Sequence, residues 1–220
     1  TVIEHEGSGP NADRQAGPHP HAAVCGPDGE FLYVPDLGTD EVVIYEIGLE
    51  DGSLSRSGAV ETAPGAGPRH LAFHPTEPLA YLITELASTF VTYERDASTG
   101  GLTPIGSTST LPERYDGANQ PSEIAVHPDG EWVYGANRGH DSIALARIRS
   151  DGALEFVETV PTGGEWPRYF AIDPAGEVLF VQNRESDDVV PFRIDPDDGT
   201  LTEVDGRFGV PAPSCMAFRE

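Results

Sequence analysis

One pattern recurs four times along the chain and restricts the possible folds more than any other feature. In each copy a proline-led turn, typically Pro-Asp-Gly, is followed by a run of aromatic and β-branched residues. Successive copies start about 50 residues apart, and such periods with several short apolar runs per unit are typical of β-propeller blades. The copies lie at residues 27–34, 75–82, 128–135 and 174–181.

Each unit predicts four short strands. A first strand precedes the Pro-Asp-Gly turn, in which Pro presets φ and Gly tolerates positive φ. The aromatic run forms the second strand, a polar loop leads to a third, and another Asp/Gly turn precedes a fourth. No segment shows sustained apolar periodicity of 3.6 residues, so the chain is predicted to be all-β. The expected first strands are 22–25, 71–73, 124–126 and 170–172.

The ends of the chain predict strands that belong to further blades. Residues 1–5 have the pattern of the last strand of a preceding blade, and 213–218 that of the first strand of a fifth unit. Four units would barely suffice for a closed ring. We therefore expect residues 1–220 to form a single but partial β-propeller domain, with four complete four-stranded blades, flanking strands and missing N-terminal blades. A signal peptide could have been lost with those blades.

The charge of the chain bears on its habitat and its partners. The chain has 13 basic residues, all of them arginine, and 37 acidic residues that are scattered along it, so its net charge is −24. Salt screens such self-repulsion, so we predict a halophilic protein of a high-salt cytoplasm. Nucleic-acid binding requires a basic stripe, which is absent. No apolar run is long enough to span a bilayer, so no membrane partner is expected.

Two cysteines, Cys25 and Cys215, lie far apart in the sequence. This spacing makes a disulfide framework improbable and suits a reducing compartment. Both are expected to be small buried residues on comparable first strands.

The repeat also predicts a ligand site. In an up-and-down blade, residues just before the first strand and just after the second line the same mouth of the central channel. Four arginines, two acids and a histidine at this mouth favour an anionic, oxygen-rich ligand. The alternative is weak ion pairing between exposed loops. The candidate residues are His21, Arg69 and Arg168 from one ring and Asp36, Glu85, Arg138 and Arg184 from the other.

The sequence does not decide which histidine belongs to this site, and it shows no metal or cofactor motif. The first repeat carries one extra residue, so either His19 or His21 could face the channel. The sequence contains no zinc-ligand spacing, no Gly-rich phosphate loop and no nucleophile elbow. We therefore predict neither a metal nor a cofactor.

Five segments carry motifs whose order and spacing match a known family. They are 7–21, 65–75, 83–86, 137–143 and 161–168. With them, essentially the whole chain strongly resembles the seven-bladed propeller lactonases, which include propeller-type 6-phosphogluconolactonases and fungal-type carboxymuconate lactonising enzymes. The resemblance implies roughly three missing N-terminal blades and a metal-independent site. It matches His21, Arg69, Glu85 and Arg138 to the family's proposed active-site positions and Arg168 to a further arginine.

These residue types suit the opening of a sugar lactone, which needs a base, positive charge for the oxyanion and a proton for the leaving alkoxide. Glu85 could be the base and His21 the proton carrier. Arg69 and Arg138 could hold the oxyanion and a phosphate or carboxylate, while Arg168, Asp36 and Arg184 bind substrate.

The expected function is hydrolysis of 6-phosphogluconolactone to 6-phosphogluconate, a step of the pentose phosphate pathway of carbohydrate metabolism. The expected partner is therefore a small anionic lactone, bound by a protein that is monomeric when full length. Two alternatives are open: a carboxy-cis,cis-muconate cycloisomerase, which uses the same residue types, and a non-catalytic propeller that serves as a binding scaffold.

Overall fold

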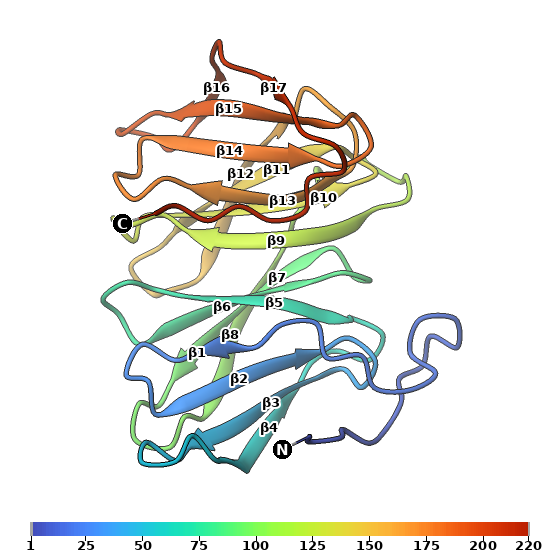
Figure 1. Cartoon of the computed structure of the whole chain (residues 1–220), viewed down its shortest axis with the longest axis vertical. Coiled ribbons are helices and arrows are strands. Elements are labelled where there is room, and N and C mark those ends of the chain that lie inside the picture. Colours follow the sequence, from blue (N-terminus) through green and yellow to red (C-terminus); the bar gives the residue numbers. More distant parts are fainter. Residues whose placement is uncertain (1, 220) are drawn as a thin grey trace. The chain divides into compact units, whose positions relative to one another are not determined.

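The computed structural model describes residues 2–219 and contains 17 strands, labelled in Figure 1. The chain divides into two compact units, residues 1–107 and 108–220, and each is described by itself. Within the described residues, no helical segment has the length and hydropathy needed to cross a membrane.

Two four-stranded antiparallel sheets occupy residues 24–109, the second ending just past the limit of the first unit. In each sheet the strands are neighbours in chain order, as in an up-and-down propeller blade. The first sheet is β1 (Val24–Cys25), β2 (Phe31–Asp36), β3 (Glu41–Ile47) and β4 (Leu54–Glu61). The second is β5 (Pro68–Phe73), β6 (Leu79–Thr84), β7 (Thr89–Arg95) and β8 (Leu102–Ser109).

The second unit repeats this arrangement, and the prediction of four four-stranded blades is confirmed. Its first sheet is β9 (Gln120–Val126), β10 (Trp132–Arg138), β11 (Ser142–Ile148) and β12 (Leu154–Pro161). Its second is β13 (Pro167–Ile172), β14 (Val178–Asn183), β15 (Asp188–Ile194) and β16 (Leu201–Glu203), with β17 (Phe208–Gly209) also paired to β15.

Three expectations about the ends of the chain and the cysteines are wrong. Residues 2–5 and 213–218 form no strand, because neither segment pairs with a strand of the described residues. Thr1, the first residue of the predicted N-terminal strand, lies outside the described residues. Both cysteines are free and exposed rather than buried. Cys25 lies on the two-residue edge strand β1, and Cys215 lies outside any strand.

Neighbouring blades within each unit are joined by the same contact. The buried hydroxyl of Tyr33 on β2 donates to the carbonyl oxygen of Gly100 at 2.9 Å, and Tyr134 on β10 donates to Gly199 at 2.7 Å. Both glycines have positive φ, and a Cβ on Gly100 would lie 2.5 Å from the ring of Phe31. Only glycine lets the turn of one blade approach the aromatic core of its neighbour this closely.

A second recurrent contact starts at the turn after the second strand of a blade. Asp40, Asp141 and Asp187 stand at this place with left-handed φ values of 58°, 52° and 54°, and we call them the turn aspartates. Each carboxylate accepts a backbone N–H from the segment that leads toward the next blade. The donors are Gly65 (2.6 Å) and Gly67 (2.8 Å) for Asp40, Trp166 (2.9 Å) for Asp141 and Ala212 (2.7 Å) for Asp187.

We expect Asp40→Ala to lower the free energy of unfolding by about 2–3 kcal/mol, because two backbone N–H groups lose a charged acceptor. Chemical denaturation of the whole natural protein measures the change. The exposed Glu50→Ala is the matched control and should stay within about 0.5 kcal/mol of wild type. An equally small change in Asp40→Ala would contradict the role given to the turn aspartate.

Candidate active site

The pairing of β1 and β2 decides between the two N-terminal histidines. Pro20 bridges to Asp36 just as Pro68 pairs with Thr84 on the next blade. His21 therefore occupies the position of Arg69, directly after the proline. Its Nε2 atom lies 3.9 Å from Glu85 Oε2. Of the two alternatives, the structure favours His21.

A β-bulge positions the arginine at the start of the first strand. The register shifts between Pro68 and His70 in one blade and between Pro167 and Tyr169 in another. Arg69 and Arg168 are the residues left without a strand partner. Bulges redirect a side chain, which explains why the blade can place an arginine here.

Asp36 lies one residue before the position that the sequence analysis gave it. It pairs with Glu41 at the place where Thr84 pairs with Thr89, so Leu37 takes the place of Glu85. Successive residues of a strand face opposite sides, so Asp36 does not share the ring of Glu85. Its fully buried carboxylate lies 2.6 Å from His5 Nδ1 and accepts the N–H groups of His19 (2.6 Å) and Gly38 (2.9 Å).

The first unit brings a buried carboxylate and two guanidinium groups together. Glu85 is only 2% exposed, and its Oε2 accepts a hydrogen bond from Arg69 Nε at 2.9 Å. Its Oε1 accepts a hydrogen bond from Arg14 Nη2. Because each charge has a partner, the ion pairs offset the cost of burial.

Histidines flank this cluster. The ring of His21 stacks on that of His19 at 5.5 Å and lies 5.8 Å from that of His70. His21 is partly exposed and Glu85 is buried, so an ionisable ring adjoins a carboxylate that two arginines hold. Such an arrangement can move a proton between a carboxylate and a ligand.

The sequence interpretation missed Arg14. This residue lies outside the repeat, 71 positions before Glu85, so strand periodicity does not point to it. Its isolation was the available signal: it is the only basic residue before Arg56. A single arginine inside a Gly- and Pro-rich N-terminal segment is a candidate for a role outside the repeat.

In the second unit, Arg138 is held from two sides. Its Nε donates to the carbonyl oxygen of Gln120 at 2.8 Å and its Nη2 to that of Pro121 at 3.2 Å. The guanidinium lies 5.4 Å from the ring centre of Trp166, within cation–π range. Arg138 is thus a fixed, buried cation.

Arg168 and Arg184 form a different kind of pair. Arg168 is half-buried, and burial together with the neighbouring Arg184 lowers its pKa. Arg184 is half exposed, with Nε 3.7 Å from Glu185 Oε1. Within residues 2–219 Arg168 makes no hydrogen bond or ion pair. Two neighbouring cations without a buried acid are suited to an anionic ligand.

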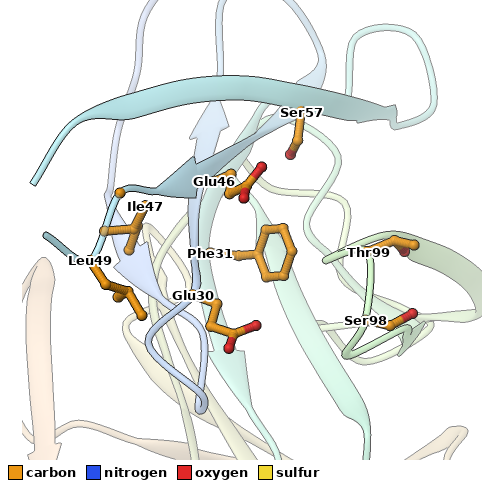
Figure 2. A pocket seen from close by; sticks show the side chains of 9 residues that line it. Glu30, Phe31, Glu46, Ile47, Leu49, Ser57, Ser98 and Thr99 are labelled. Carbon is orange, nitrogen blue, oxygen red and sulfur yellow. The ribbon is translucent and has the colours of Figure 1, made fainter.

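A metal centre and the hollow at the start of β2 were two other places to expect a ligand, and neither suits an anion in the described chain. Residues 2–219 contain no group of three or more His, Cys, Asp or Glu side chains arranged to hold a metal ion. A hollow of about 530 Å³ opens at the start of β2, the opposite end of that strand from Asp36 (Figure 2). Glu30 and Glu46 flank its Phe31 ring and no basic residue lines it. An anion would therefore be repelled there.

Together these features define a propeller-type fold with a buried, arginine-bound glutamate beyond the end of a second strand. The chain belongs to the family described as lactonase, 7-bladed beta-propeller, whose model matches residues 1–218. It is 42% identical over 215 residues to the 6-phosphogluconolactonase of Bacillus subtilis, covering 97% of this chain and 61% of that protein.

Solved structures agree with this assignment. A Lactobacillus plantarum protein is 32% identical with a TM-score of 0.92, over 96% of this chain and 61% of that one. A periplasmic gluconolactonase from Pseudomonas aeruginosa is 30% identical with a TM-score of 0.90, over 98% of this chain and 60% of that one. The chain thus spans about three fifths of the length of these relatives.

We expect inorganic phosphate to raise the melting temperature of the whole natural protein through Arg168, because the anion relieves repulsion from Arg184. Arg168→Gln should melt at or above wild type without phosphate and gain less from it. Arg149→Gln, which removes an exposed arginine near Asp151, is the matched control. Equal phosphate stabilisation of wild type and Arg168→Gln would contradict the prediction.

Proposed function

We propose that the protein containing this chain is a lactonase that hydrolyses a sugar-acid lactone, with 6-phosphogluconolactone as its substrate. Membership of the lactonase family supports the reaction class. The observation that carries the proposal is the Glu85 carboxylate, which is buried and bonded to Arg69 and Arg14 beside His21. This combination supplies a base, positive charge and a proton carrier.

The proposed reaction begins with water. Glu85 takes a proton from the water as its oxygen forms a bond to the lactone carbonyl carbon, and the carbonyl electron pair moves onto oxygen. The resulting oxyanion collapses, the bond between this carbon and the ring oxygen breaks, and protonated His21 gives its proton to that oxygen. The product is a hydroxy acid, and the enzyme is restored when Glu85 releases its proton to solvent and His21 takes one up from solvent.

For Arg69 we propose a role different from the one expected from sequence. Its side chain is only 1% exposed, and its Nε is already bonded to Glu85. We therefore propose that Arg69 orients the base. Arg138, held by two carbonyl oxygens, is proposed as a fixed cation for a substrate oxygen.

The phosphorylated lactone is favoured by two observations. Arg168 and Arg184 form a pair of cations suited to a phosphate, and the Bacillus subtilis relative is named 6-phosphogluconolactonase. The Pseudomonas aeruginosa relative is named a gluconolactonase, so the unphosphorylated lactone is the second candidate. We also propose that the protein works without a metal, as a monomer, in the cytoplasm of a high-salt cell.

We expect Glu85→Gln in the whole natural protein to lower kcat for 6-phosphogluconolactone by about 10²–10⁴-fold, because the amide cannot accept the proton from water. Proton release, followed with a pH indicator, measures turnover against the spontaneous rate. Glu94→Gln makes the same chemical change at an exposed position of β7 and should keep wild-type activity.

Full activity in Glu85→Gln would refute Glu85 as the base. Faster turnover of carboxymuconate than of either lactone would instead favour the cycloisomerase. Binding without turnover of any of these compounds would favour a scaffold.

A further inference from the structure

The loop that carries Arg14 is anchored by a buried amide. Gln15 is fully buried, and its Nε2 donates to the carbonyl oxygen of Leu37 at 2.8 Å. Its Oε1 accepts the N–H of Asn11 at 3.0 Å. A Cβ on Gly9 would lie 2.5 Å from this amide, so the chain passes Gln15 where no larger residue fits. The loop is therefore fixed to the turn after β2.

A local turn then directs the residues of this loop. The side-chain oxygen of Asn11 accepts the N–H groups of Asp13 and Arg14, each at 3.2 Å. The backbone N–H of Gln15 donates to the carbonyl oxygen of Asn11 at 2.7 Å. Asparagine favours such turns because its side chain replaces a backbone acceptor. The backbone of Arg14 is thus held on both sides before its side chain reaches Glu85.

The two arginines that donate hydrogen bonds to Glu85 differ in solvent exposure. The side chain of Arg69 is 1% exposed, whereas that of Arg14 is 33% exposed. Arg14 uses Nη2 on Glu85 Oε1, and within residues 2–219 its other guanidinium donors make no hydrogen bond. A guanidinium has five N–H donors in a fixed plane, so Arg14 can hold the carboxylate and a second oxygen at once.

We propose that Arg14 is a catalytic residue that stabilises the oxyanion formed on the lactone carbonyl, and that Arg69 is a positioning residue. This inference rests on the proposed lactonase function. The oxyanion forms where the oxygen of a water activated by Glu85 attacks, so its stabilising cation must adjoin Glu85 and face the ligand. Arg14 bonds Glu85, and its partial exposure leaves it accessible to a ligand. A donor to the oxyanion acts on kcat more than on KM.

The test compares Arg14→Ala and Arg14→Lys in the whole natural protein, with 6-phosphogluconolactone and gluconolactone. We expect Arg14→Ala to lower kcat by about 10²–10³-fold for both lactones, with KM within about threefold. Arg14→Lys should recover part of kcat, and guanidinium ion at non-denaturing concentration should partly rescue Arg14→Ala. Arg56→Ala removes an arginine from an exposed ion pair with Glu41 in the same unit and should change nothing.

Calorimetry with gluconate separates this inference from the proposed function, because the carboxylate of gluconate occupies the place of the oxyanion. We expect Arg14→Ala to bind gluconate about tenfold more weakly than wild type. If wild type hydrolyses neither lactone, the lactonase proposal fails. The gluconate affinities of wild type and Arg14→Ala then test whether Arg14 binds an anionic oxygen. Unchanged kcat and unchanged gluconate affinity in Arg14→Ala would overturn the inference. So would a loss that neither lysine nor guanidinium restores, or a wild type that does not bind gluconate.

Discussion

The candidate site depends on one contact, in which the backbone N–H of the residue before a proline donates a hydrogen bond to a turn aspartate. Asp40 accepts the N–H of Gly67, and the carbonyl oxygen of Gly67 accepts the N–H of Glu85 at 2.7 Å. In the second unit Asp141 holds Trp166, whose carbonyl oxygen accepts the N–H of Arg184 at 3.0 Å. Gly67 and Trp166 are each followed by a proline, and the arginine after that proline lies on the β-bulge. The bulge redirects the side chain of this arginine.

The same backbone arrangement therefore carries two different electrostatic environments. Arg69 on one bulge is buried and bonded to Glu85, which offsets its charge. Arg168 on the other bulge is half-buried and next to a second cation, Arg184, and both effects lower its pKa. An arginine whose charge is balanced by a carboxylate fixes the geometry of that carboxylate. An arginine next to a second cation is stabilised most by an external anion. Within residues 2–219, the repeat thus places arginines with and without a carboxylate partner at equivalent strand ends.

The sequence predicts the blades well because their signals are local: a Pro-Asp-Gly turn and an aromatic strand identify each unit without reference to distant residues. The details of the site depend on register and on contacts between distant residues. Asp36 was assigned to the wrong position because the first blade carries its acidic residue one position earlier than the second blade does. Leu37 therefore occupies the place of Glu85. Arg14 was missed because its contact with Glu85 joins a loop outside the repeat to a strand end 71 residues away.

The proposed anionic substrate would approach a chain with a net charge of −24, and the arginines of the cluster in the first unit offset that charge locally. The two positive charges of Arg14 and Arg69 exceed the one negative charge of Glu85, and Arg14 is the more exposed of the two arginines. At physiological ionic strength, charges beyond about 8 Å are largely screened. The potential at the site is then set by its own arginines rather than by the acidic surface. Higher salt screens the acidic surface further, so a chain with this net charge can bind an anion without a change in its surface charge.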